Sequence, residues 1–455
     1  MHRGPSLWHK EVMTPTLPPL ACIVLAAGQG TRMKSALPKV LHKVAGLPMI
    51  AHVLNACGDL APAHRLVVIG PDSGLIEHAV APVPCVIQPK PLGTGDAVKA
   101  ARKALEGFQG DIAVVYSDSP LITSASIQAL QKRRHETGAT IIVAGFEPKD
   151  PSPYGRLVRD AQGHLLEIVE SFEATPEQAA ISLCWGGMML FDSTKLWALL
   201  DQLTDQNSKK EFFLTDCIAL ARQAGGFCAT ATVPAEDVLG VNNRVELAQA
   251  EAIMQRRLRE KAMRAGVTMQ DPESVFLSMD TKFGRDVVLA PHIVIGAGVD
   301  IADNVEIRAF CSLEQTRIEE GAIIGPFARL RPGASIGAGA HIGNFVEIKN
   351  STIGKETRVN HLSYIGDADL GSKSNIGAGT ILANYDIQKR KHRSQIGSNV
   401  GTGANSVFVA PVSVGDGAYI GAGSVITHDV PADALAVARS RQSIHEGWAA
   451  RKKKS

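Results

Sequence analysis

The sequence predicts an α/β domain followed by a β-solenoid, and two observations carry this prediction. Apolar strand patterns alternate with helical patterns in the first half of the chain, which is typical of a doubly wound, Rossmann-like, mostly parallel sheet. In the C-terminal third, aliphatic residues recur every six positions, which indicates a hexapeptide β-solenoid. We expect a disordered leader (1–20), an α/β domain (21–242), a helical linker arm (243–265), a hexapeptide-repeat β-helix (266–440) and a C-terminal tail (441–455).

Composition narrows the function classes. The 455 residues have room for two or three domains, and a net charge of +2 gives no reason to expect nucleic acid or a membrane as a partner. The seven cysteines contain no C-x-x-C pair, which indicates reduced thiols in a cytoplasmic protein. The first 20 residues contain four prolines and lack the apolar core of a signal peptide, which indicates a disordered leader. Translation could also start at Met13.

The α/β domain begins with an apolar strand at 21–25, which a glycine-rich turn follows. Further strands are predicted at 66–70, 86–88, 112–116 and 140–145, and helices at 49–60, 96–105 and 124–136. The segment 243–264 then has an uninterrupted helical pattern without Gly or Pro, which indicates a connecting arm.

The solenoid is expected from near Phe283 to about Pro431. Each hexad supplies one flat side of a coil and points one aliphatic residue inward, so that stacked coils bury a continuous column. The spacing of six is shortened to five twice, from Leu313 to Ile318 and from Ile348 to Ile353, and then resumes. The inward positions of the first runs are Ile295, Ile301, Ile307, Leu313, Ile318, Ile324, Leu330, Ile336, Ile342 and Ile348.

The turn after the first strand reads Leu25-Ala26-Ala27-Gly28-Gln29-Gly30-Thr31-Arg32-Met33 and is expected to open a helix. Glycines let backbone N–H groups approach a phosphate, and a helix N-terminus favours negative charge. The turn matches neither the Walker loop nor G-x-G-x-x-G, because Met33 occupies the last glycine position. Taken alone, such a turn fits a plain connection equally well.

Nearby residues favour a nucleotide site. Arg32 and Lys39 place two cations beside the turn, which suits a triphosphate. Gln88 closes a strand, and Gly93-Thr94 forms a second glycine-rich turn before a helix. Asp118 follows an apolar strand, where ligands of open α/β sheets bind, so it is placed either to hold a cation or to cap a turn.

The solenoid rhythm breaks between Ile376 and Ile396, and the segment 383–392 is polar and basic. Insertions in a solenoid form loops on one face, often the binding face. A lone His such as His361 is more often structural than catalytic, but a free pKa near working pH suits a general base. The polar residues that accompany it in this part of the chain are Arg331, Lys349, Tyr364 and Asn375.

The motif L-x-x-G-x-G-T-R-M followed by P-K resembles the sugar-nucleotide pyrophosphorylases. With the solenoid included, residues 21–448 resemble the bacterial bifunctional N-acetylglucosamine-1-phosphate uridyltransferase/glucosamine-1-phosphate acetyltransferases. This resemblance implies UDP-N-acetylglucosamine synthesis from UTP and acetyl-CoA, with Mg²⁺ as cofactor. It also implies a left-handed parallel β-helix and a homotrimer with acetyl-transfer sites between subunits.

The resemblance assigns roles to single residues. In the first domain, Asp118 and Asn242 would bind Mg²⁺, and Gly155 and Glu170 would hold the sugar. The nucleotide would contact Leu25, Ala26, Ala27, Gly28, Lys39, Gln88, Gly93 and Thr94. In the solenoid, His361 would be the base, and Arg331 and Lys349 would hold the sugar phosphate. The sugar or acyl group would contact Tyr364, Asn375, Asn384 and Tyr385, and coenzyme A would contact Ala404, Ala422 and Arg439.

Four positions depart from the family pattern. Ser117 stands where glycine is usual, and Trp185 where asparagine is usual. Either the sugar preference changes or the first site is weak, or Trp185 only packs at the pocket wall and activity survives. Ala404 replaces a common serine, and Ile387 replaces a common glycine in the protruding loop. Two other readings stay open. One is a pyrophosphorylase for another sugar or nucleotide with an inert solenoid, and the other is a non-catalytic assembly protein.

Overall fold

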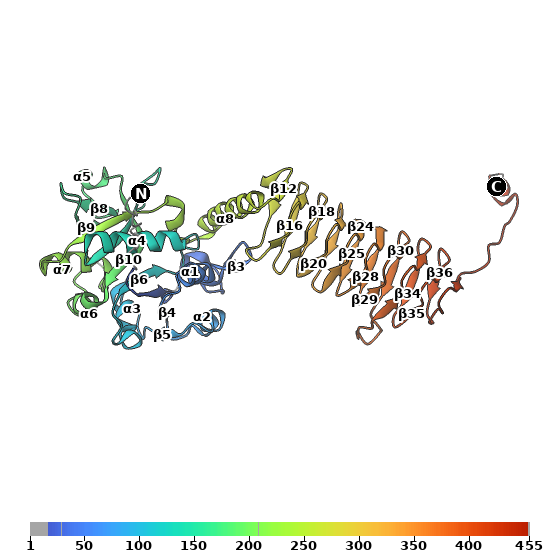
Figure 1. Cartoon of the computed structure of the whole chain (residues 1–455), viewed down its shortest axis with the longest axis horizontal. Coiled ribbons are helices and arrows are strands. Elements are labelled where there is room, and N and C mark those ends of the chain that lie inside the picture. Colours follow the sequence, from blue (N-terminus) through green and yellow to red (C-terminus); the bar gives the residue numbers. More distant parts are fainter. Residues whose placement is uncertain (1–16, 29, 208, 454–455) are drawn as a thin grey trace, which may run out of the picture. The chain divides into compact units, whose positions relative to one another are not determined.

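A computed structural model describes residues 17–28, 30–207 and 209–453 (Figure 1). The chain divides into two compact units, Met1–Met254 and Gln255–Ser455. The predicted fold class is confirmed, because the first unit holds a Rossmann-like sheet and the second a parallel β-helix. Most of the predicted leader, residues 1–16, lies outside the described residues, and the first strand already begins at Leu20.

The sheet of the first unit has the order β11-β7-β10-β6-β1-β4-β5. All neighbours in this order pair in parallel except β10, which is antiparallel to both β6 and β7. A hairpin of β8 and β9 extends from β10, and β2 pairs with β3 apart from the main sheet. The strands are β1 (Leu20–Leu25), β2 (Lys43–Val44), β3 (Leu47–Pro48), β4 (His64–Ile69), β5 (Cys85–Ile87), β6 (Asp111–Tyr116), β7 (Ile141–Phe146), β8 (Arg156–Arg159), β9 (Leu165–Val169), β10 (Cys184–Asp192) and β11 (Cys228–Thr232).

Helices cover both faces of this sheet (Figure 1). Alternate residues of β1 therefore enter two different cores: Cys22 and Val24 pack in one, and Ala21 and Ile23 in the other. Burial on both faces explains why the predicted parallel strands are almost wholly apolar. The helices are α1 (Met49–Gly58), α2 (Gly74–Val80), α3 (Thr94–Ala100), α4 (Ser124–Thr137), α5 (Pro176–Ala179), α6 (Ser193–Asp201) and α7 (Cys217–Gln223), with 3₁₀ turns η1 (Thr31–Met33), η2 (Lys39–Leu41), η3 (Arg102–Leu105), η4 (Leu214–Asp216) and η5 (Ala235–Val238).

The glycine-rich turn opens only the single 3₁₀ turn η1, so the expectation of a helix there is wrong. Lys34 ends it with a φ of 48°, a left-handed conformation that an α-helix cannot continue through. The next regular segment is the short turn η2, which begins at Lys39. Lys39 therefore stands on a fixed turn that packs against the core through Val40 and Leu41.

The arm is the helix α8 (Arg244–Arg264), one residue shorter at its start than predicted. The Asn243 carboxamide oxygen accepts the backbone N–H groups of Val245 (2.9 Å) and Glu246 (3.0 Å), so Asn243 caps the helix. The Gln255 side chain exchanges two hydrogen bonds with the Leu277 backbone, at 2.7 and 2.8 Å. These bonds attach the second half of α8 to the first coil of the β-helix.

The β-helix consists of three parallel sheets whose strands alternate along the chain. The first sheet contains β12 (Thr268–Met269), β15 (Val288–Leu289), β18 (Glu306–Ile307), β21 (Ile323–Ile324), β24 (His341–Asn344), β27 (Arg358–His361), β30 (Asn375–Ile376), β33 (Gly401–Thr402), β36 (Tyr419–Ile420) and β38 (Leu435–Ala436). The second contains β13 (Val275–Phe276), β16 (Ile293–Ile295), β19 (Ser312–Leu313), β22 (Arg329–Leu330), β25 (Glu347–Lys349), β28 (Tyr364–Gly366), β31 (Ile381–Ala383), β34 (Val407–Val409) and β37 (Val425–Ile426). The third contains β14 (Lys282–Phe283), β17 (Asp300–Ile301), β20 (Thr316–Ile318), β23 (Ala334–Ile336), β26 (Thr352–Ile353), β29 (Ala368–Leu370), β32 (Ser394–Ile396) and β35 (Ser413–Val414).

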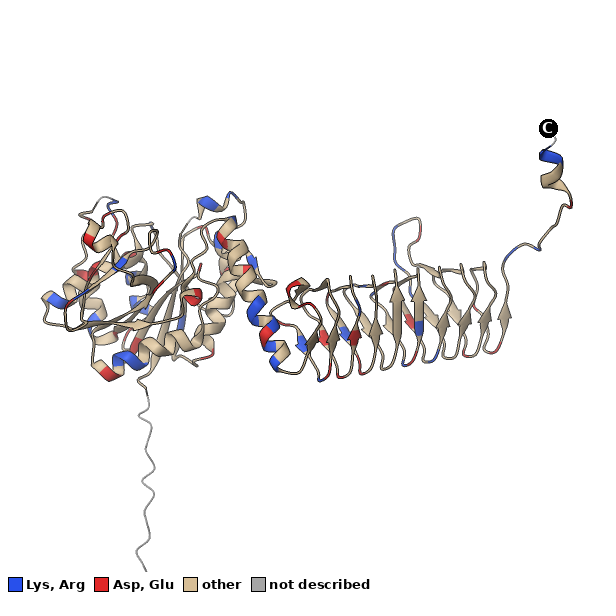
Figure 2. Ribbon diagram, turned by 90° about the horizontal axis from the view of Figure 1, so that it is seen from above, with Lys and Arg blue, Asp and Glu red and all other residues tan. Residues whose placement is uncertain are grey.

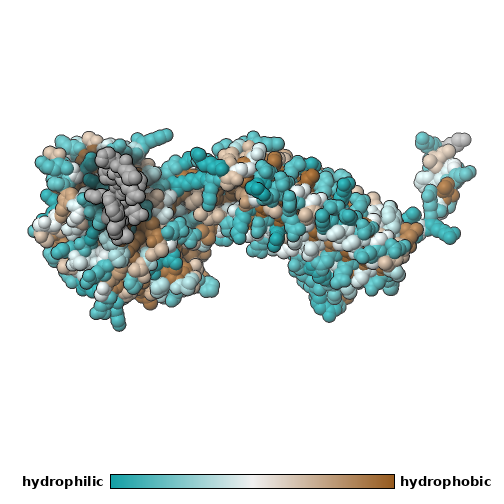
Figure 3. All heavy atoms as spheres, viewed as in Figure 1, coloured by the Kyte–Doolittle hydropathy of each residue, from teal (hydrophilic) through white to brown (hydrophobic). Residues whose placement is uncertain are grey.

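Aliphatic residues of successive coils lie in register inside the β-helix. Ile307 pairs with Ile324, Ile324 with Ile342, and Ile342 with Val359, and all four are fully buried. Burying such a side chain is worth about 1.5–3 kcal/mol. The face seen in Figure 3 is accordingly mostly hydrophilic. The solenoid begins at Thr268, earlier than the predicted Phe283, because its first coil lacks the isoleucine rhythm.

Two further predictions concern the whole chain. All seven cysteines are free thiols, as expected. In the part of the chain that the structure describes, no helix is both long enough and apolar enough to cross a membrane. The tail after Arg439 is exposed and carries the short helix α9 (Trp448–Lys452).

Candidate active sites

A cavity of about 230 Å³ opens at the carboxyl ends of β1 and β6. This is the position at which open α/β sheets bind ligands. Nine of the predicted nucleotide-site residues line it: Leu25, Ala26, Ala27, Gly28, Lys39, Gln88, Gly93, Thr94 and Asp118. A second hollow of about 340 Å³ shares Ala26, Ala27, Gly28, Gln88 and Pro91 with it, so the two adjoin.

Lys39 joins the two predicted metal ligands. Its ammonium nitrogen lies 2.5 Å from the Asp118 carboxylate and 3.4 Å from the Asn242 carboxamide oxygen. Arg32 reaches the same Asn242 oxygen at 2.9 Å. The predicted oxygen ligands, on Asp118 and Asn242, and the predicted cations, Lys39 and Arg32, therefore lie in one hydrogen-bonded cluster.

Backbone hydrogen bonds hold Asn242 beside Asp118. The Asp118 carbonyl accepts the Val241 N–H at 2.8 Å, which places Asn242 beside the end of β6. Glu246 accepts the Asn242 N–H at 2.6 Å and holds the segment from the other side. Asp118 and Asn242 are more than a hundred residues apart in sequence, and this backbone bond brings them side by side.

The oxygen pair fits Mg²⁺. Both oxygens converge on one cation, the ammonium of Lys39, so they can face another cation at the same point. Among the described residues, no group of three or more His, Cys, Asp or Glu side chains is placed to hold a metal. Mg²⁺ needs no such cage, because it takes one or two protein oxygens and completes its shell with phosphate and water.

The second glycine-rich turn is held by Gln88, whose amide donates to the Gly93 carbonyl (3.1 Å) and to Asp96 (2.8 Å). Gly93 has a φ of +114°, and a Cβ there would lie 2.6 Å from the Phe212 carbonyl oxygen. Only glycine therefore fits this position. The Thr94 hydroxyl accepts the Leu214 N–H at 3.0 Å, so the turn is fixed before a ligand arrives.

The three predicted sugar-site residues lie side by side. The backbone N–H of Trp185 donates to the Gly155 carbonyl at 2.8 Å. A Cβ built on Gly155 would lie 4.0 Å from the Cα atom of Glu170. Burial raises the pKa of the Glu170 carboxyl, and the nearby Lys209 opposes this effect.

Ser117 and Trp185, the two departures in this domain, have different environments. The Ser117 hydroxyl is buried and donates to the Leu25 carbonyl at the end of β1, at 2.6 Å. Its proton is therefore engaged by the backbone. The Trp185 ring packs edge-on against Tyr116 with centroids 6.1 Å apart. Its indole N–H is buried and has no hydrogen-bond partner among the described residues.

In the β-helix, Arg331 donates to Glu347 at 2.7 Å, and this hydrogen bond raises the pKa of the guanidinium. The Lys349 ammonium lies 6.0 Å from the Tyr385 ring centroid, a cation–π distance. The predicted cations lie on neighbouring coils of one sheet, because Arg331 directly follows β22 and Lys349 ends β25.

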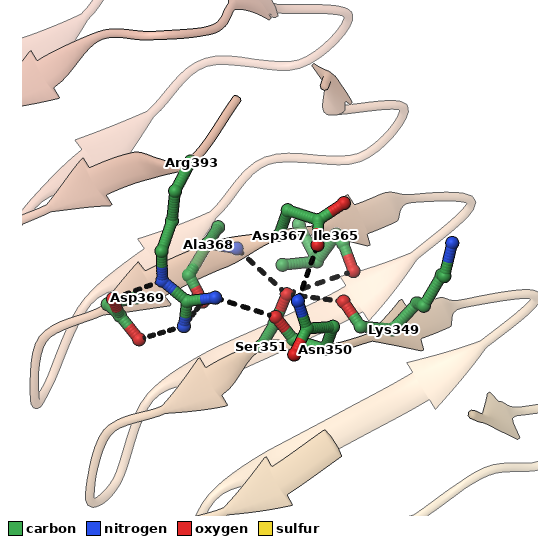
Figure 4. A network of polar contacts seen from close by, with 8 residues as sticks. All are labelled: Lys349, Asn350, Ser351, Ile365, Asp367, Ala368, Asp369 and Arg393. Atoms are coloured by element: carbon green, nitrogen blue, oxygen red, sulfur yellow. Dashed lines mark hydrogen bonds and ion pairs between the residues drawn. The ribbon is translucent and has the colours of Figure 1, made fainter. Parts of the chain in front are cut away.

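Asp367 organises this face, and the sequence analysis missed it. Its carboxylate accepts hydrogen bonds from Asn350 at 2.5 Å and from Asn384. Figure 4 shows the Asn350 part of this network and the Arg393 guanidinium beside it. Arg393 is paired with Asp369 and donates to the Asn350 carbonyl at 3.0 Å. These bonds hold both ends of the 384–393 loop on the sheet. The role of Asp367 could not be predicted from the sequence, because it is a single aspartate between hexads without a motif around it.

The loop that breaks the repeat is a folded hairpin, and it projects from the β-helix in Figure 2. Tyr385 and Lys391 form an antiparallel bridge. Asp386 accepts from Arg390 at 2.8 Å and from His392 at 3.0 Å, and the bond from His392 is the first cause that lowers the pKa of Asp386 to about 2. Ile387 at the tip is 94% exposed.

His361 ends β27 and is exposed, and its Nδ1 lies 2.7 Å from the Asn344 carboxamide oxygen on β24. The predicted coenzyme A positions adjoin one another on later coils. The Gly423 N–H donates to the Ala404 carbonyl at 2.8 Å, and a Cβ on Gly423 would lie 3.7 Å from Arg439. Gly403 closely approaches Ala422. Tyr364 is half-buried, and burial raises the pKa of its hydroxyl; Asn375 is exposed at the start of β30.

The fold and these sites define a class: a nucleotidyltransferase domain fused to a hexapeptide β-helix. Comparisons with known proteins agree with it. Residues 22–216 match the MobA-like NTP transferase domain family, and residues 313–434 match the GMPPB C-terminal domain family.

Whole-length relatives specify the family. The chain is 52% identical over 433 residues to Bifunctional protein GlmU of Paramagnetospirillum magneticum, which covers 95% of this chain and 96% of the relative. It is 51% identical to the protein of the same name from Rhodospirillum rubrum and 48% identical to that from Xanthobacter autotrophicus, with 94–96% of each chain covered. The chain therefore belongs to the bifunctional GlmU family.

Proposed function

We propose that this protein is the bifunctional enzyme of UDP-N-acetylglucosamine synthesis. Its β-helix domain acetylates glucosamine-1-phosphate with acetyl-CoA. Its α/β domain transfers UMP from UTP to the product and releases pyrophosphate. The observation that carries the proposal is the convergence of Lys39, Arg32, Asp118 and Asn242 at the sheet edge. In the β-helix, Lys349 contacts Tyr385 of the loop that breaks the repeat.

Uridyl transfer is a direct displacement. A phosphate oxygen of N-acetylglucosamine-1-phosphate attacks the α-phosphorus of UTP, and pyrophosphate leaves. Lys39 and Arg32 bind the phosphates, and Gly28 and Gly93 let backbone N–H groups approach them. Mg²⁺ held by Asp118 and Asn242 would neutralise phosphate charge. Glu170 and Gly155 hold the sugar, so the domain acts mainly by positioning.

Acetyl transfer requires a base. The amine of glucosamine-1-phosphate attacks the thioester carbonyl of acetyl-CoA, and His361 takes the amine proton while the coenzyme A thiolate leaves. Arg331 and Lys349 bind the sugar phosphate. Tyr364, Asn375, Asn384 and Tyr385 orient the sugar and acyl groups, and Ala404, Ala422 and Arg439 contact coenzyme A.

A homotrimer completes the acetyl-transfer site. The interior of the prism is filled by aliphatic residues, so a pocket for coenzyme A has to form between the prism and another copy. One corner of the prism carries a surface that favours such a contact, which we call the aromatic ladder: His292, Phe310, Phe327 and Phe345. Neighbouring rings stack with centroids 4.8–5.0 Å apart, and the three phenylalanines are 44–54% exposed.

The ladder has two properties of a self-association surface. All four residues have φ between 54° and 61°, a conformation that L side chains rarely adopt, so this exposure is held at a cost in strain. A copy rotated about an axis parallel to the column presents the same ladder at the same heights. The ladder also continues into Leu362, which is 60% exposed and directly follows His361, so whatever covers it reaches the base.

Steady-state assays of the purified protein test the function. We expect release of coenzyme A with glucosamine-1-phosphate and acetyl-CoA, and release of pyrophosphate with N-acetylglucosamine-1-phosphate and UTP, the latter dependent on Mg²⁺. Pyrophosphate release without acetyl transfer would favour a pyrophosphorylase with an inert solenoid. Absence of both would favour an assembly protein. The free thiols of all seven cysteines favour the cytoplasm as the location.

A further inference from the structure

Asn344 lies one coil before His361 and directly beside it. The two residues are parallel pairing partners of β24 and β27, so the backbone register sets their side chains next to each other. The Asn344 Oδ1 atom is 2.7 Å from the His361 Nδ1 atom. Neither the sequence analysis nor the proposed function assigns a role to Asn344.

A carboxamide oxygen can only accept a hydrogen bond, so His361 Nδ1 has to carry the proton in this contact. In a neutral imidazole the other nitrogen, Nε2, then carries the lone pair. The contact selects one of two tautomers and also fixes the ring's orientation about its axis. A base needs both properties, because it can accept a proton only through a lone pair that faces the amine.

We propose that Asn344 is the positioning residue of acetyl transfer, which holds His361 in the Nδ1–H tautomer so that Nε2 faces the substrate amine. This inference rests on the proposed acetyl transfer. Asn344 acts through His361 and touches no reacting atom. During the reaction Nε2 gains the amine proton, and the Nδ1–H bond to Asn344 is kept in the imidazolium that forms.

Among the described residues, the acceptor within hydrogen-bond distance of His361 Nδ1 is Asn344 Oδ1. A cleft of about 330 Å³ beside it is lined by Arg308, His341, Asn344 and Phe345. The charged groups that act on His341 in this cleft are Arg308, Arg358 on β27 and Glu306, together with His361 itself. The Glu306 carboxylate accepts the Arg308 Nε–H at 2.8 Å, so it is engaged by that guanidinium. A neutral acceptor at position 344 orders the ring without the stronger pull that a carboxylate would exert on the proton.

The test compares two substitutions in the full-length protein. Asn344→Leu keeps the volume and removes the acceptor. We expect kcat of acetyl transfer to fall about 10- to 100-fold, by analogy with the loss of hydrogen-bond partners of metal-binding imidazoles. Asn344→Asp keeps the acceptor and should recover most of kcat. Its added charge favours the imidazolium, so the acid limb of the kcat/KM profile should move to higher pH.

Three measurements make the result decisive. Uridyl transfer by the same preparations should stay at the wild-type level, which shows that the α/β unit is folded and present in equal amount. His341→Asn, in the same cleft, leaves the Asn344–His361 bond in place and should keep acetyl transfer within about threefold of wild type. ¹⁵N NMR of the imidazole should show protonated Nδ1 in the wild type and a shift toward protonated Nε2 in Asn344→Leu.

The outcomes separate the two claims. Wild-type protein without acetyl transfer would refute the proposed function. Active wild-type protein together with an Asn344→Leu variant of equal kcat and unchanged tautomer would refute the role of Asn344 alone. A variant with lowered kcat that Asn344→Asp does not restore would also refute it, because loss of packing rather than of the acceptor would then be the cause.

Discussion

The ammonium of Lys39 and the carboxylate of Asp118 form an ion pair of 2.5 Å at the mouth of the amino-terminal cavity. Lys39 comes from the turn η2 and Asp118 from the end of β6, so the pair ties the glycine-rich turn to the sheet edge. Both groups are largely shielded from solvent, with side chains 13% and 22% exposed. A triphosphate that enters the cavity meets a cation already placed for it.

Asp118→Ala should abolish UDP-sugar formation and leave acetyl transfer unchanged. The substitution removes one of the two oxygens that face the cation position and leaves the Lys39 ammonium without its anion. Pyrophosphate release and coenzyme A release, measured on one preparation across a Mg²⁺ series, check this. Normal uridyl transfer with normal Mg²⁺ dependence would contradict the metal assignment.

His361→Ala should lower acetyl transfer by about two to four orders of magnitude, the usual span for loss of a general base. Uridyl transfer should not change, because His361 lies in the other unit. Single-turnover measurement of coenzyme A release at neutral pH is the readout. Near-normal turnover would mean that His361 only supports the structure.

Trp185→Asn should change the KM for the sugar phosphate more than the KM for UTP. The backbone N–H of Trp185 donates to the carbonyl of Gly155, a proposed sugar-site residue, and the buried indole N–H has no partner among the described residues. Asparagine would supply a compact donor and acceptor there. Initial rates with each substrate varied in turn decide the matter. Two unchanged KM values would show that Trp185 only packs at the wall.

Phe327→Glu should break the trimer and acetyl transfer together. The change puts a charge in the middle of the aromatic ladder, between Phe310 and Phe345. Gln315→Glu is the matched control, because it adds the same group at an exposed corner with φ of 43° outside the ladder. Light scattering gives the mass of each variant. A trimeric Phe327→Glu protein, or a fully active monomer, would refute the ladder as the shared surface.

Asp386→Ala should open the 384–393 hairpin and raise the KM for the acetyl acceptor. The lowered pKa of Asp386 means that the hairpin is stabilised by the ionised carboxylate. This stabilisation is complete above the ordinary value near 3.8 and is lost as pH falls toward about 2, so the loop should be closed at working pH. Trypsin cleavage after Lys389 and Arg390 should be faster in the variant. Equal cleavage rates would show that other bonds close the loop.

The sequence was most informative where one physical rule dominates. Period six predicted the β-helix because every coil must bury the same kind of residue, and strands buried on both faces predicted most of the parallel sheet. The strands β8, β9, β10 and β11 were missed, because they are partly exposed or carry glycine and a register shift, as β10 does after Trp185. The hexad rhythm placed the start of the solenoid near Phe283, although β12 begins at Thr268, because the first coil lacks the isoleucine rhythm.

The site residues also differ in how well the sequence predicted them. Motifs located the residues that line the first cavity, since a phosphate site depends on local backbone shape. The contacts of Asn344 and Asp367 depend on register between coils, which no motif in the chain reveals. The aromatic ladder escaped notice because its members recur once per coil, 17 or 18 residues apart, at turns where glycine or asparagine is usual.

The stacked coils of the β-helix make its two ends unequal. At the first end, α8 is bonded to Leu277 and covers the opening coil. At the other end, β38 is a two-residue strand with Leu435 68% exposed, and no further coil follows among the described residues. A column in which each coil is stabilised only by its neighbours frays from its uncovered end. Ala404, Ala422 and Arg439 lie there, so a bound coenzyme A would act as a lid on the last coils and raise their melting temperature.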